Sequence, residues 1–227
     1  MARDRILRPI EILREDVRRM FRRPFIVLLA LNLLLMLATT SLPEEADATA
    51  FVTWCILAAL SVFVQAALTL AAVEEGPDRS ADRWVRTALA KKVFWRLLAT
   101  ELLLFLALLV SAFLLVVGAL FVGAALGLGM QAAVIERKGP SEALYRSVEL
   151  TRADRVGFGA LFAIAYLVPM AVGQASVYLT GTFALIVAIN LVVTLTLTAG
   201  TLALTRAYLQ LKAHAEAEGE KAGSPTA

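Results

Sequence analysis

The sequence predicts an all-α integral membrane protein with six transmembrane helices, and three observations support this prediction. Hydrophobic residues make up 59% of the 227 residues and charged residues only 18%, whereas soluble domains are nearer half apolar and a quarter charged. The mean hydropathy is +0.75. The apolar residues form long runs, and every Lys and Arg lies between alternate runs. A multi-pass topology follows from this pattern.

The apolar runs determine the predicted number of helices. A hydrocarbon core about 30 Å thick needs roughly 20 helical residues, because backbone polar groups must be satisfied within the segment. The stretch 97–135 covers 39 residues and would be about 58 Å long as one helix. We therefore divide it near Val117–Gly118. The predicted spans are 24–42, 50–73, 97–117, 119–135, 156–176 and 183–206.

The basic residues test this count independently, since cytoplasmic loops are enriched in Lys and Arg. All 22 fall on one side of a six-span arrangement, and the first loop on the other side carries Glu44, Glu45 and Asp47 instead. We expect a multi-pass protein of the cytoplasmic membrane with both termini in the cytoplasm. A cleaved signal peptide is the alternative for the N-terminus, and the four acidic residues among the first 23 disfavour it.

Three basic segments that lead into spans resemble one another. Each has apolar residues at helical spacing among charged ones, as expected for a helix lying in the headgroup layer. They align at one leucine each, Leu13, Leu89 and Leu144. We expect three pseudo-repeats of an amphipathic surface helix plus a transmembrane hairpin. The surface segments are 9–23, 84–96 and 140–154. The predicted parts are a basic cytoplasmic helix (1–23), a six-span domain (24–206) and a polar, disordered cytoplasmic tail (207–227).

The segment 134–150, VIERKGPSEALYRSVEL, carries a resemblance to a known family. An apolar run ends in a glutamate, a glycine follows, and an EAL-x-x-S helix leads through Leu-Thr into the next span. This pattern resembles the membrane domain of bacterial glycerophosphoryl diester phosphodiesterases and its stand-alone integral-membrane relatives. The resemblance implies six spans without catalysis, because the chemistry of those enzymes belongs to a separate soluble domain. The matching residues are Glu136, Gly139, Glu142, Ala143, Leu144, Ser147, Leu150 and Thr151.

The residues needed for most enzyme chemistry are missing from the predicted spans. The chain has one histidine, His214, in the polar tail and one cysteine, Cys55, within an apolar run. No serine therefore has a histidine base in the membrane, and a GK[ST] phosphate-binding motif is absent. We expect a non-enzymatic protein without metal or cofactor. Nucleic acid is a poor partner, because the basic residues are dispersed along membrane-flanking segments.

Polar residues within the spans are the candidate functional residues. The last span carries a polar stripe at helical spacing, which either lines a cavity or holds helices together through hydrogen bonds. Its opposite face is expected to meet lipid through Leu191, Leu195 and Leu202. Gln65 and Asn32 are the expected partners on other spans. The stripe consists of Asn190, Thr194, Thr198, Thr201 and Thr205.

Glu101 is the one ionisable residue inside a predicted span. Such a residue is by default a functional candidate. It also lies five residues after Arg96, close enough to the interface for anchoring or an ion pair. Interfacial anchoring, a packing ion pair and proton or ion handling are the three alternatives.

The sequence therefore favours a scaffold or accessory protein at the cytoplasmic membrane surface. Its basic helices would attract anionic lipid headgroups by about 1 kcal/mol per Lys or Arg, and a membrane protein is a second candidate partner. A small transporter or lipid-handling protein is the alternative, since the polar stripe and a fifth span kinked at Pro169 could form a pathway. The small-residue ridge of Ala119, Gly123 and Gly127 predicts close helix packing.

Overall fold

The structure, a computed structural model, describes residues 10–12, 14, 23–40, 48–73, 91–112, 115–169, 171–172 and 183–223. These residues are helical apart from short turns and include no strand, which confirms the all-α prediction for this part of the chain. Two of the three predicted surface segments, 9–23 and 84–96, lie mostly outside the described residues. The third, 140–154, can be compared in full.

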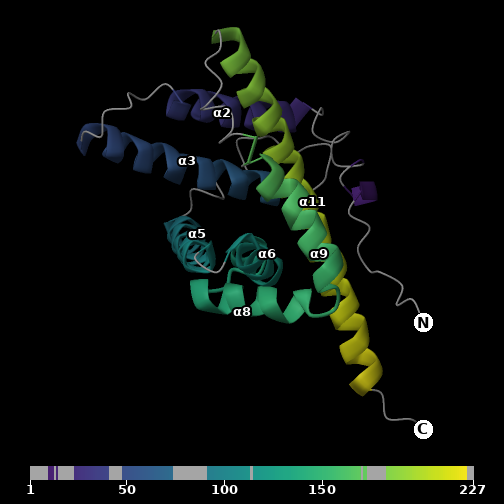
Figure 1. Cartoon of the computed structure of the whole chain (residues 1–227). Helices are drawn as coiled ribbons and strands as arrows, with labels where there is room; N and C mark the ends of the chain where they lie inside the picture. The colour runs from purple at the N-terminus through teal and green to yellow at the C-terminus, as the bar shows by residue number, and fades with distance from the viewer. Residues whose placement is uncertain are drawn as a thin grey trace.

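The helices follow one another as α2, α3, α5, α6, α7, α8, α9, the π-helical turn η1 and α11. In Figure 1, α5 and α6 are seen along their axes, whereas α2 and α3 run across the view. The two pairs therefore cross steeply. The long α11 contacts both α2–α3 and α8–α9. The bounds are α2 Arg23–Thr40, α3 Ala48–Val73, α5 Lys91–Ala112, α6 Leu115–Leu126, α7 Gly129–Ile135, α8 Pro140–Thr151, α9 Arg155–Phe162, η1 Ala163–Leu167 and α11 Phe183–Gly223.

Two helices among the described residues are long and apolar enough to cross a membrane. They cover Cys55–Val73 in α3 and Val187–Glu218 in α11. Shorter apolar helices lie at Phe25–Leu35, Leu120–Ile135 and Arg155–Leu167. Length and composition alone make this a weak indication of membrane crossing, because core helices of soluble proteins meet the same criterion.

The predicted division of the stretch 97–135 near Val117–Gly118 is wrong in position. α5 ends at Ala112 and α6 begins at Leu115, so the chain divides earlier. A second break at Gly127–Leu128 then separates α6 from α7. Glycine is a poor helix former, and contacts with α8 described below stabilise this second break.

A change of helix type comes just before Pro169, the residue at which the fifth span is predicted to kink. Pro169 lacks an N–H and cannot donate to the carbonyl of Ala165, four residues earlier. The chain forms the π-helical turn η1 at this position. Gly200 of α11 packs against Ala165, since a β-carbon on Gly200 would lie 2.8 Å from the Ala165 carbonyl oxygen. The irregular turn and the glycine thus allow α11 to approach closely.

The prediction of a disordered tail at 207–227 is wrong for most of that segment, because α11 continues to Gly223. Tyr208 and Leu211 are buried in the core shared with α8 and α9. Beyond them, Lys212 pairs with Glu216 and His214 approaches Glu218, each four residues apart. Such pairs, together with alanine, stabilise a helix.

The small-residue ridge of α6 serves packing within the chain. A β-carbon on either Gly123 or Gly127 would overlap the ring of Phe162. Phe162 ends α9, so the two glycines let α9 lie close against α6. Phe162 in turn stacks on Tyr166, with ring centroids 5.5 Å apart.

Candidate functional site

The polar stripe of α11 is buried along its whole length. Asn190 is 5% exposed, and the four threonines of the stripe are fully buried. Of the three leucines predicted to face lipid, Leu191 is 40% exposed, whereas Leu195 is half-buried against the core and Leu202 is 2% exposed. The prediction is therefore correct only for Leu191. Leu202 belongs instead to a buried apolar cluster that includes Phe25 of α2, Leu68 of α3 and Met130 of α7. The prediction that the stripe faces protein is confirmed.

The expected partners on other spans meet the middle of the stripe. The Asn32 amide of α2 donates to the Thr198 hydroxyl at 3.4 Å. The Thr201 hydroxyl donates to the side-chain amide oxygen of Gln65 on α3, and the Tyr166 hydroxyl of η1 lies 3.5 Å from the Thr201 hydroxyl. Hydrogen bonds therefore join α11 to three other helical segments here.

Glu101 lies on α5, and no ion pair joins it to another residue that the structure describes. Its side chain on α5 is half-buried. Within the described part of the chain, no Lys or Arg lies within ion-pair distance of Glu101. This geometry does not support the packing ion pair among the three alternatives.

A second polar centre forms around α8, where the local sequence directs the start of the helix. Gly139 precedes the helix with extended backbone angles, and Pro140 occupies the first helical position, where its missing N–H is not needed. The Glu142 carboxylate accepts from the Gly139 N–H at 3.4 Å. The resulting helix buries Ala143, Ser147 and Leu150 on one face, as its amphipathic pattern predicts.

Ser147 connects α8 to the break between α6 and α7. Its hydroxyl donates to the Ala125 carbonyl oxygen at 2.8 Å and accepts from the Leu128 N–H at 3.0 Å. Both backbone groups lie at the break, where the regular helix ladder is interrupted. Leu144 packs nearby against Gly129, the first residue of α7. α8 is thereby fastened to the interrupted helix by a buried, fully paired hydroxyl.

We expect Ser147→Ala to lower the free energy of unfolding by about 2 kcal/mol, because buried backbone groups left unpaired cost about 1–3 kcal/mol each. Denaturant unfolding of the detergent-solubilised protein would measure this loss. Ser141→Ala is the matched control, since Ser141 is exposed on the same helix. A loss below about 0.5 kcal/mol, the range of ordinary surface changes, would contradict the role assigned to Ser147.

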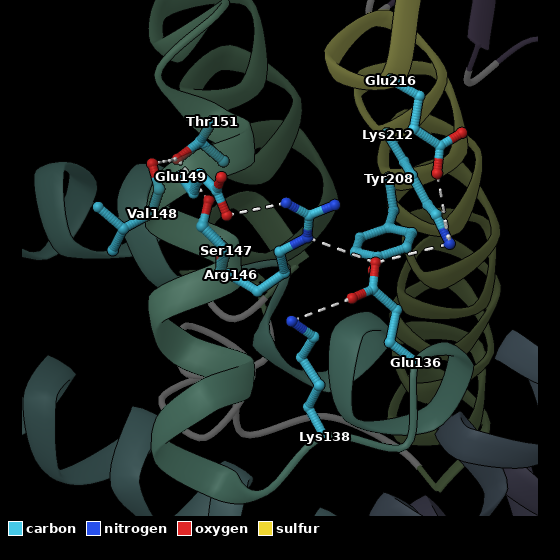
Figure 2. Close-up of polar contacts among 10 residues, drawn as sticks. All are labelled: Glu136, Lys138, Arg146, Ser147, Val148, Glu149, Thr151, Tyr208, Lys212 and Glu216. Carbon is cyan, nitrogen blue, oxygen red and sulfur yellow. Dashed lines mark hydrogen bonds and ion pairs between the residues drawn. The ribbon is translucent and has the colours of Figure 1, made fainter. Parts of the chain in front are cut away.

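Glu136, directly after α7, is the centre of an ion-pair cluster between α8 and α11 (Figure 2). Its carboxylate accepts a hydrogen bond from the Tyr208 hydroxyl of α11. The Nε atom of Arg146 on α8 lies 3.4 Å away, and the Nζ atoms of Lys212 and Lys138 lie 3.6 and 3.4 Å away. One carboxylate therefore joins two helices that follow it in the chain.

The cations control the ionisation of this carboxylate. Burial by itself raises the pKa of Glu136, since its side chain is only 12% exposed. The hydrogen bond from Tyr208 and the charges of Arg146, Lys212 and Lys138 act in the opposite direction and hold the pKa below its ordinary value. Glu136 is therefore ionised at neutral pH. Arg146 also binds Glu149 at 2.8 Å, so the cluster extends to the outer face of α8 (Figure 2).

The sequence pattern singled out Glu136 and Ser147 only through the family resemblance, without assigning a contact to either. Tyr166, Tyr208 and Gln131 were not identified as candidates. Gln131 lies in an apolar helix and is fully buried. The sequence does carry a signal for Gln131, because it is a polar residue within an apolar run. The partners of Glu136 lie up to 76 residues away, so spacing could not reveal them.

Comparisons with known proteins do not assign the chain to a class. No family model, curated protein or solved structure matches it. The resemblance to the phosphodiesterase membrane domain therefore stays a hypothesis that rests on the residues of segment 134–150.

Proposed function

We propose that this chain is a non-enzymatic, multi-pass protein of the cytoplasmic membrane that acts as a scaffold or accessory protein. In this proposal α8 is the docking element on the cytoplasmic surface. The observation that carries it is the attachment of α8. Ser147 and Glu136 hold its inner face firmly, while Tyr145, Glu149 and other polar residues remain on the outer face.

Exposed apolar residues support the membrane location. On α3, Val52, Ile56 and Leu60 recur every four residues and are 55%, 55% and 44% exposed. On α5, Leu102 and Phe105 are 65% and 59% exposed. Continuous apolar faces of this kind mark contact with a membrane or a partner. Together with the one-sided placement of the basic residues, they favour lipid as that contact.

The closed polar stripe supports the scaffold over the transporter. A substrate pathway along α11 would need space beside its polar residues. Instead, Asn32 and Gln65 form hydrogen bonds to Thr198 and Thr201 across the helix interfaces. Such contacts hold helices together, each contributing about 0.6 kcal/mol in a membrane.

One observation favours the second candidate, a small transporter or lipid-handling protein. Both polar atoms of the buried Gln131 amide, and the buried hydroxyl of Thr194, find no hydrogen-bond partner among the described residues. Unsatisfied polar atoms in a hydrocarbon environment cost several kcal/mol. Water or a polar ligand would remove this cost.

The six-span topology predicts that Ala46 and Ser141 lie on opposite sides of the membrane. In a Cys55→Ala background, a single cysteine at Ala46 should react with an impermeant reagent from outside. A cysteine at Ser141 should react only after permeabilisation. The steep crossing of α2–α3 and α5–α6 in Figure 1 counts against six nearly parallel passes, since transmembrane helices tilt by about 20° on average. Labelling of both sites from one side would overturn the topology and the docking role together.

A further inference from the structure

A shallow groove of about 380 Å³ lies along the outer face of α8. It lies opposite the face that Ser147 fastens to the α6–α7 break, so occupying it need not disturb the core. The lining residues are Lys138, Ser141, Glu142, Tyr145, Arg146 and Glu149.

The charges of the groove are balanced. Lys138 and Arg146 contribute two positive charges, and Glu142 and Glu149 contribute two negative charges. An anionic headgroup without a positive group would have to lie beside two carboxylates. A ligand that carries one negative and one positive group can pair with the two cations and with the carboxylates.

The charged groups retain unused hydrogen-bonding capacity. Arg146 uses Nε for Glu136 and one terminal nitrogen for Glu149, while a guanidinium has five N–H donors in all. Glu149 is 56% exposed, and a carboxylate accepts about four hydrogen bonds. A ligand can therefore bind without breaking the pairs already present.

We propose that this groove binds the headgroup of phosphatidylethanolamine, a deeper assignment that rests on the membrane location proposed above. The phosphate pairs with Lys138 and Arg146. The primary ammonium donates its hydrogen bonds to Glu149, which the 2.8 Å pair with Arg146 holds next to the phosphate. The quaternary ammonium of phosphatidylcholine cannot donate such bonds, and phosphatidylglycerol has no positive group.

Lipid is the assigned occupant because of where the groove lies. Tyr145 on α8 is 75% exposed, and Trp95 near the start of α5 is 62% exposed. The hydrogen bond from Arg96 to the Arg137 carbonyl oxygen holds the start of α5 next to the segment that leads into α8. Exposed Trp and Tyr side chains are enriched at the headgroup level of membrane proteins. The two aromatic residues thus mark this end of the molecule as the interface.

Titration of the purified full chain in mild detergent with water-soluble dihexanoyl phospholipids tests the proposal. By calorimetry, the ethanolamine lipid should bind about tenfold more tightly than the choline or glycerol lipid, as expected for one charge-assisted hydrogen-bond set. Glu149→Gln should reduce binding of the ethanolamine lipid to the level of the choline lipid. Lys138→Gln should weaken binding of all three lipids. Glu218→Gln, exposed on α11 outside the groove, should change nothing.

Equal affinity for the three lipids, or preference for the glycerol lipid, would overturn the proposal. Alkaline carbonate extraction of membranes separates this result from failure of the proposed function. A chain that stays in the membrane but shows no lipid preference refutes the headgroup site alone. A chain released by carbonate refutes the membrane location as well.

Discussion

Gly200→Leu is expected to destabilise the protein by about 3 kcal/mol, the upper part of the range for overpacking a close contact. A β-carbon at this position would lie 2.8 Å from both the β-carbon and the carbonyl oxygen of Ala165. These atoms belong to the π-helical turn η1, so they cannot move without disturbing that turn. The adjacent contact between Thr201 and Tyr166 would separate at the same time. Thermal unfolding in detergent would measure the change.

Ala188→Leu is the matched control for this substitution. Ala188 lies on the same helix but is exposed, so the added leucine should change stability by no more than about 0.5 kcal/mol. If Gly200→Leu does not fold, Gly200→Ala provides the smaller test, with an expected loss of about 1 kcal/mol. Unchanged stability in the alanine variant would show that α11 does not approach η1 as closely as described.

Glu136→Gln should lower the free energy of unfolding by about 2 kcal/mol, within the range for hydrogen bonds to charged groups. Glutamine keeps an acceptor for Tyr208 but removes the negative charge that three cations share. Chemical unfolding at pH 7 would measure the loss. Glu216→Gln is the control, because Glu216 is exposed and lies 4.0 Å from Lys212. Such surface pairs contribute about 0–1 kcal/mol.

The pH dependence gives a second measure of the same cluster. The pKa of Glu136 in the folded protein is lower than its ordinary value of 4.5. Its stabilising contribution is therefore complete above pH 4.5 and is lost as the pH falls through the folded pKa. The difference in melting temperature between the native protein and Glu136→Gln should shrink steadily below that pH. A difference that stays constant down to pH 3 would mean that the charge of Glu136 does not stabilise the fold.

The burial of the polar stripe illustrates what can be derived from residue order. Asn190, Thr194 and Thr198 share one helix face because they recur every four residues. An amide or hydroxyl within an apolar environment needs a partner, which predicts both burial and hydrogen bonds to Asn32 and Gln65. The structure contains those bonds, but at Thr198 and Thr201. Helical periodicity predicts which face of α11 is buried. The position along the helix axis at which another helix contacts that face depends on how the helices pack.

Helix boundaries were predicted less well, because contacts across the chain decide them. The break at Gly127–Leu128 persists since the Ser147 hydroxyl replaces the missing backbone partners. The tail beyond residue 206 is helical since Tyr208 and Leu211 are buried against α8 and α9. Neither contact can be read from the segment that it stabilises.

Residue types and their periodicity thus determine the helical class, the amphipathic nature of α8 and the burial of the stripe. These features depend on local hydrogen bonding and on the free-energy cost of placing polar groups in hydrocarbon. The tertiary structure alone decides that Glu136 meets Arg146 and Tyr208. A carboxylate attracts any cation in the chain, and nothing in residue order selects which one comes within reach. The packing of α8 against α7 and α11 brings these side chains together, and so creates both the ion-pair cluster and the groove beside it.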